Sequence, residues 1–91
     1  MKENNELKMK EFGLPEEVTQ WLVARDARVT GDKKEWDIHY NKNGYYVNVC
    51  STLEPEVVTV IADGGSRGQF FAFRFRKDEL RNELERLEKL F

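Results

Sequence analysis

The sequence predicts an α+β fold, in which an N-terminal helix, a four-stranded antiparallel meander sheet and a C-terminal helix follow one another. Three observations predict this order. Apolar residues recur at helical spacing near both ends, alternating or β-branched runs lie between them, and turn residues separate those runs. Each helix has one apolar stripe, so both helices are expected to pack on one face of the sheet.

The first helix is expected from about Pro15 to about Asp26. Pro15 suits the first helical position, where the missing N–H costs nothing, and Val18 and Leu22 lie four residues apart on one stripe. Residues 27–34 are expected to connect this helix to the sheet, with a short strand around Val29 as an alternative.

The chain before this helix is polar and charged, and its few apolar residues define no face. Residues 1–11 are therefore predicted to form a flexible N-terminal tail, or a frayed helical turn. A single α+β domain is predicted over residues 12–91, since 91 residues suit one hydrophobic core.

The central hairpin is predicted from the stretch HYNKNGYYVNV. Asn43 and Gly44 tolerate the positive φ angles of a two-residue type I′ turn. Counting outward from that turn gives one apolar face and one polar face, and a slip of one residue would mix them. The predicted pairs are Lys42 with Tyr45, Tyr40 with Val47, Ile38 with Val49, Trp36 with Ser51, Asn41 with Tyr46, His39 with Asn48, and Asp37 with Cys50.

Two further strands and a helix complete the predicted fold. The run EVVTVIA is apolar on both sides, as in an inner strand, and QFFAFRFR alternates phenylalanines on one side with mixed residues on the other. Asp78 is the expected N-cap of the last helix, whose leucines recur at helical spacing. The predicted core floor of the sheet comprises Trp36, Ile38, Tyr40, Val47, Val49, Phe71, Phe73 and Phe75.

Composition excludes several classes of protein and disfavours others. The net charge is −2, from 15 basic and 17 acidic residues, so no overall basic excess favours nucleic acid. The only cysteine is Cys50, so neither an internal disulfide nor a cysteine-based zinc site can form. This chemistry fits a cytoplasmic protein without metal or cofactor. The sequence has no apolar run of signal-peptide or transmembrane type, so no membrane role is expected.

The polar face of the predicted sheet is the candidate binding surface, because it mixes aromatic and hydrogen-bonding side chains. The loop Asp63–Gly68 is expected at its margin. The sequence therefore favours a small non-enzymatic module that binds a protein partner and can self-associate as a homodimer through the C-terminal helix or the uncovered face. The predicted partner-binding residues are Tyr46, Asn48, Phe70, Arg74, Arg76 and Arg67.

Two alternatives remain open on the same face. Tyr46, Arg74 and Arg76 form a platform that could stack bases and neutralise phosphates, as nucleic-acid-binding sheets do. Cys50 and His39 are diagonal neighbours across the hairpin and could form a nucleophile–base pair. The enzyme is the weaker alternative, because a flat strand surface offers neither a water-excluding pocket nor an oxyanion site.

Overall fold

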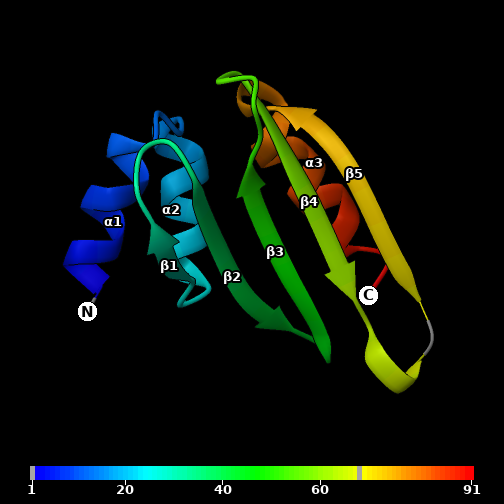
Figure 1. Ribbon diagram of the computed structural model, residues 1–91. Coiled ribbons are helices and arrows are strands. Elements are labelled where there is room, and N and C mark those ends of the chain that lie inside the picture. The colour runs from blue at the N-terminus through cyan, green and yellow to red at the C-terminus, as the bar shows by residue number, and fades with distance from the viewer. Residues whose placement is uncertain (1, 68) are drawn as a thin grey trace.

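The computed structural model describes residues 2–67 and 69–91. One antiparallel sheet of five strands, in the order β1-β2-β3-β4-β5, has helices on one side (Figure 1). The strands are β1 Arg28–Gly31, β2 Trp36–Lys42, β3 Tyr45–Ser51, β4 Val57–Asp63 and β5 Phe70–Arg76. The helices are α1 Lys2–Glu11, α2 Glu16–Ala24 and α3 Leu80–Glu88, with 3₁₀ turns at Gly65–Arg67 and Lys77–Glu79.

The predicted α+β class is confirmed, but the predicted number of strands is wrong, because the sheet has five strands rather than four. The additional strand is β1, which pairs antiparallel with β2 and places Val29 opposite Ile38. Its four residues contain one apolar side chain, too few to show an alternating pattern. The turn after β1 is held by the Asp32 carboxylate, which accepts hydrogen bonds from the backbone N–H groups of Lys34 and Glu35.

Helix α1 occupies the segment for which the sequence predicts a flexible tail or a frayed helical turn. Its Met9 is fully buried, and the Asn5 side chain donates a hydrogen bond of 3.2 Å to the carbonyl oxygen of Ala27. Just beyond α1, Phe12 stacks on Trp36 with ring centroids 4.9 Å apart. Contacts with α2 and the sheet thus fix a segment whose own sequence has no helical stripe.

The predicted hairpin is confirmed in turn and register. Asn43 and Gly44 both have positive φ, 51° and 84°, as a type I′ turn requires. Ile38 lies opposite Val49 and His39 opposite Asn48, and the other predicted pairs from Asp37 to Tyr45 are also found. The apolar side chains of both strands therefore point together toward the helices.

The hydrophobic core lies between the sheet and the three helices. Every buried strand residue is on the helix-facing side, including the β4 residues Val58, Val60 and Ala62. The helices contribute Met9, Val18, Leu22, Leu80, Leu84 and Leu87 to the same core. Phe71, Phe73 and Phe75 of β5 share this side, as predicted, but Phe73 keeps 39% of its surface exposed.

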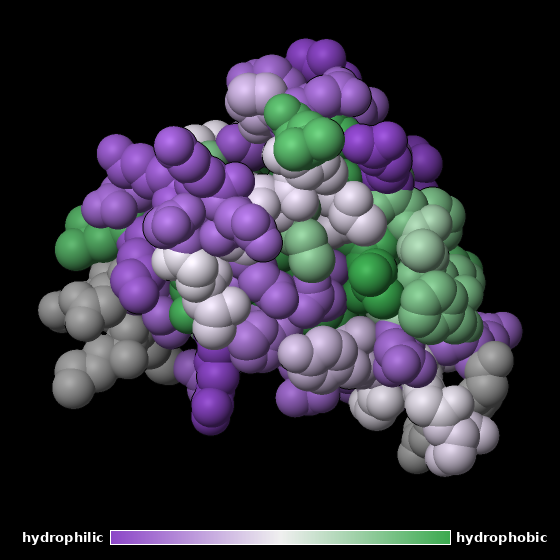
Figure 2. Space-filling model, viewed as in Figure 1, coloured by the Kyte–Doolittle hydropathy of each residue, from purple (hydrophilic) through white to green (hydrophobic). Residues whose placement is uncertain are grey.

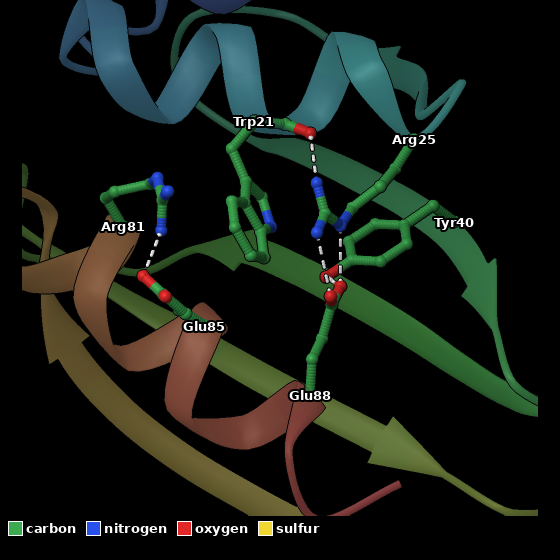
Figure 3. A network of polar contacts seen from close by, with 6 residues as sticks. All are labelled: Trp21, Arg25, Tyr40, Arg81, Glu85 and Glu88. Atoms are coloured by element: carbon green, nitrogen blue, oxygen red, sulfur yellow. Dashed lines mark hydrogen bonds and ion pairs between the residues drawn. The ribbon is translucent and has the colours of Figure 1, made fainter.

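A polar cluster joins α2 to α3 and β2 (Figure 3). The Arg25 guanidinium donates two hydrogen bonds, of 2.7 and 2.8 Å, to the Glu88 carboxylate, which also accepts one from the Tyr40 hydroxyl. The Trp21 ring lies between the Arg25 and Arg81 guanidinium groups, 3.3 and 4.1 Å from its centroid. Burial, opposed by the Trp21 indole and reinforced by Glu88, raises the pKa of Tyr40 well above its ordinary value.

None of the helices in the described residues has both the length and the apolar character that crossing a bilayer requires.

Candidate functional site

The candidate site is the face of the sheet that points away from the helices, here called the open face. The strand register assigns its side chains to the solvent side of each strand. From β1 to β5 they are Arg28, Thr30, Asp37, His39, Asn41, Tyr46, Asn48, Cys50, Val57, Thr59, Ile61, Asp63, Phe70, Ala72, Arg74 and Arg76.

The register aligns these side chains in rows that cross the strands. One row runs from Asn41 through Tyr46 and Asp63 to Phe70. The next row runs from Arg28 through His39, Asn48 and Ile61 to Ala72. A third row runs from Asp37 through Cys50 and Thr59 to Arg74. The apolar side chains of this face therefore lie on β4 and β5, whereas polar groups occur on all five strands.

Two aromatic side chains on this face are exposed to solvent. Tyr46 is 42% exposed and Phe70 is 64% exposed, and both belong to the same row. They lie two strands apart, about 10 Å from one another. Tyr46 also stacks on His39, with ring centroids 5.8 Å apart. In Figure 2, hydrophobic residues gather on the side of the molecule formed by β4 and β5.

The charges of the open face are mixed. Arg74 and Arg76 are exposed on β5, and Arg76 forms an exposed ion pair of 3.3 Å with Asp78. Arg74 has no ion pair or hydrogen bond among the described residues. Asp37 and Asp63 lie on the same face as these arginines, so the field of the face is not uniformly positive.

Five of the six predicted binding residues therefore share the open face: Tyr46, Asn48, Phe70, Arg74 and Arg76. The sixth, Arg67, ends the short 3₁₀ turn between β4 and β5, and its side chain lies outside the part of the protein that the structure describes. Arg28 is not among the predicted binding residues, because residues 27–34 are expected to form a connection and carry no clear strand pattern.

Arg28 is the first residue of the short strand β1, and it lines a groove at that end of the strand. A groove of about 880 Å³ opens where β1 begins and the edge of β2 continues past it. This groove extends the open face from Tyr46 and His39 around the edge of the sheet. Its lining residues are Asn5, Arg25, Asp26, Ala27, Arg28, Val29, His39, Tyr40, Asn41 and Tyr46.

The geometry does not favour the Cys50–His39 pair as a nucleophile and base. The Cys50 thiol contacts the Asn48 side-chain oxygen, while His39 stacks on Tyr46. Burial raises the pKa of the Cys50 thiol, and the negative charge of Asp37 adds to this effect. Catalytic thiols need the opposite shift, toward the thiolate. Among the described residues, no three His, Cys, Asp or Glu side chains are grouped to hold a metal ion.

Comparison with known proteins identifies no family for this chain. No protein-family model, no curated protein and no solved structure matches this chain. The site must therefore be interpreted from its own chemistry.

Proposed function

We propose that this protein is a small interaction module that captures a protein partner on the open face of its sheet. The observation that carries the proposal is the pair of exposed rings, Tyr46 and Phe70, set in one row of a face that no helix of the described chain covers. Exposed aromatic side chains within a polar surround are typical of the energetic centre of protein interfaces.

The arrangement supports a protein partner over a nucleic acid. Asp63 lies directly between Tyr46 and Phe70 in their row, where a phosphate backbone would meet a carboxylate. Asp37 lies in the same row as Arg74, so a nucleic acid that lay along this row would meet a second carboxylate. A protein surface can offer acceptors to the arginines and donors to the aspartates of this face, whereas the phosphates of a polyanion can pair only with the arginines.

We further propose that the module acts without catalysis and in the cytoplasm. Binding needs no enclosed pocket, which agrees with the open geometry of the face. The raised pKa of the Cys50 thiol and its single occurrence in the chain suit a reduced, unreactive cysteine.

A capture experiment with matched variants tests the proposal. The immobilised protein is incubated with lysate of the organism that encodes it, with and without nuclease, and captured proteins are identified by mass spectrometry. We expect a partner that resists nuclease and disappears with Tyr46→Glu, which changes the open face without touching the core. The control is Leu53→Glu, a similar change at a fully exposed position in the β3–β4 loop, and it should capture normally.

Two results would contradict this function. Capture that nuclease abolishes would favour the nucleic-acid platform, and oligonucleotide binding should then weaken steeply with salt. Capture that survives Tyr46→Glu would exclude the open face as the binding surface.

A further inference from the structure

We propose that the free edge of β5 pairs with β5 of a second copy of this chain, which joins two sheets into one. This self-pairing surface is the edge of the sheet with its adjoining groove, and it is distinct from the centre of the open face around Tyr46. Four features of β5 carry the inference: its free backbone groups, its uncovered apolar side, its length, and its charge pattern.

The first feature is the direction of the β5 backbone groups. The N–H of Gly64 bonds the carbonyl of Gln69, and the N–H of Lys77 bonds the carbonyl of Glu56, each at 2.9 Å. Both pairs continue the β4–β5 register, so Gln69, Lys77 and the odd-numbered residues between them direct their backbone groups at β4. The N–H and C=O groups of the even-numbered residues Phe70, Ala72 and Arg74 consequently point to the free edge, whereas the N–H of Arg76 donates a hydrogen bond to the Glu79 carboxylate.

The second feature is an apolar groove beside that edge on the helix side. Helix α3 does not cover β5 fully, and a groove of about 380 Å³ remains between them. Phe73 is 39% exposed and Leu90 is 57% exposed. The groove is lined by Phe73, Phe75, Glu83, Arg86, Leu87 and Leu90. A strand added at the edge would place its own apolar side chains over this groove.

The third feature is the contrast between the two edges of the sheet. At the opposite edge, β1 has four residues, ends in Gly31 and packs beside α1. Short, covered edges are protected against pairing. β5 has seven residues, four of them phenylalanine, and no strand of the described chain pairs with its outer edge. An edge of this kind is a template for another strand.

The fourth feature is the charge pattern of β5, which favours pairing with β5 of a second copy. When two β5 strands pair antiparallel about a two-fold axis at Phe73, all seven residues overlap. Arg74 then lies opposite Ala72 of the second copy, and Arg76 lies opposite Phe70, where a guanidinium can rest on the ring. No arginine directly faces another arginine in this register.

The backbone groups fit the same register. It makes Ala72 and Arg74, whose N–H and C=O groups face the edge, into hydrogen-bonded pairs, and it places Phe70 opposite Arg76, whose carbonyl can accept the N–H of Phe70. Phe73 meets Phe73 of the second copy in a non-hydrogen-bonded pair, where side chains approach most closely, and Phe71 meets Phe75. Moving the axis to Arg74 would oppose like charges, and moving it to Ala72 would shorten the overlap.

Symmetry closes this assembly at two copies. A two-fold contact uses the same patch on both chains, so it leaves no further edge of this kind. The open faces of both copies would then form one continuous surface of ten strands, twice the five of a single chain.

Light scattering over a range of concentrations tests the pairing. We expect a mass of twice 10.8 kDa at high concentration, falling toward 10.8 kDa on dilution. Phe73→Lys places two like charges face to face on the axis, and it should give monomers at every concentration. Leu53→Lys makes a similar change far along the chain in the β3–β4 loop, and it should remain dimeric.

Two more variants separate edge pairing from misfolding. Ala72→Pro removes an N–H that faces the free edge, which edge strands tolerate, and should leave a folded monomer by circular dichroism. In a Cys50→Ser background, Phe73→Cys should form disulfide-linked dimers under mild oxidation, because the two thiols meet on the axis. Phe75→Cys should not, because its opposite residue is Phe71.

Each other outcome overturns the proposal. If the wild-type protein is monomeric at all concentrations, β5 does not pair with a second copy, and its edge would be free to pair with a strand of another protein. A dimer that survives both Phe73→Lys and Ala72→Pro would lie elsewhere, and larger open assemblies would exclude the two-fold register. Tyr46→Glu should not change the mass, so failure of the self-pairing is distinguishable from failure of partner capture.

Discussion

Replacing Glu88 with glutamine tests whether the polar cluster between α2 and α3 stabilises the fold. The substitution keeps the size of the side chain and removes its charge. The Glu88 side chain is 9% exposed and that of its partner Arg25 is 19% exposed, so water can replace lost bonds only in part. We expect a clear decrease in the free energy of unfolding.

The size of this decrease follows from the bonds that Glu88 accepts. Its two carboxylate oxygens accept two hydrogen bonds from Arg25 and one from the Tyr40 hydroxyl, all between 2.7 and 3.0 Å. Glutamine keeps one acceptor oxygen and turns an N–H₂ group toward the guanidinium. At least one charge-assisted bond is lost, which corresponds to about 1.5–3 kcal/mol.

Urea unfolding followed by circular dichroism measures the effect. With slopes of about 1–3 kcal/mol per molar urea for small domains, a loss of roughly 2 kcal/mol lowers the midpoint by roughly 0.7–2 M. The matched control is Glu85→Gln on the same helix, where the Glu85 side chain is 48% exposed and bonds Arg81. That variant should unfold near the wild-type midpoint. Equal midpoints for the two variants would refute the stabilising role of Glu88.

Three further predictions concern the turn, the cysteine and the first helix. Gly44→Ala should cost about 1–2 kcal/mol in urea unfolding, because Gly44 has φ of 84°, a conformation that a Cβ atom disfavours. Because its thiol pKa is raised, Cys50 should react with a disulfide reagent near pH 8 several-fold more slowly in the native protein than in concentrated urea, and Asp37→Asn should speed the native reaction. Met9→Ala should cost about 2–5 kcal/mol because Met9 is fully buried, whereas Leu7→Ala, at a position 60% exposed, should leave the unfolding midpoint unchanged.

The parts of the fold that sequence could predict are those with strong local signals. The Asn43-Gly44 turn fixed a register that sorts Ile38 and Val49 to the core, and the structure has this register. Strand β1 carries no comparable signal, since Val29 is its only large apolar residue and its place depends on pairing with β2. Met9 in α1 likewise owes its burial to distant partners rather than to a local stripe.

The candidate site shows the same division. That Tyr46, Asn48 and Arg74 share one face follows from period-two alternation and correct register, and it could be predicted. That Phe73 stays partly exposed could not, because its pattern is that of a core residue. Its exposure depends on where α3 crosses the sheet, which is a property of tertiary packing and not of β5 itself.

The position of Trp21 also gives the protein an internal optical probe. Its indole ring lies between two cations, one directly after α2 and one in α3. Indole emission responds in colour and intensity to nearby charge, so separation of the two helices would change the fluorescence of this ring. With Trp36 replaced by phenylalanine, stopped-flow fluorescence would report when the two ends of the chain come together during folding.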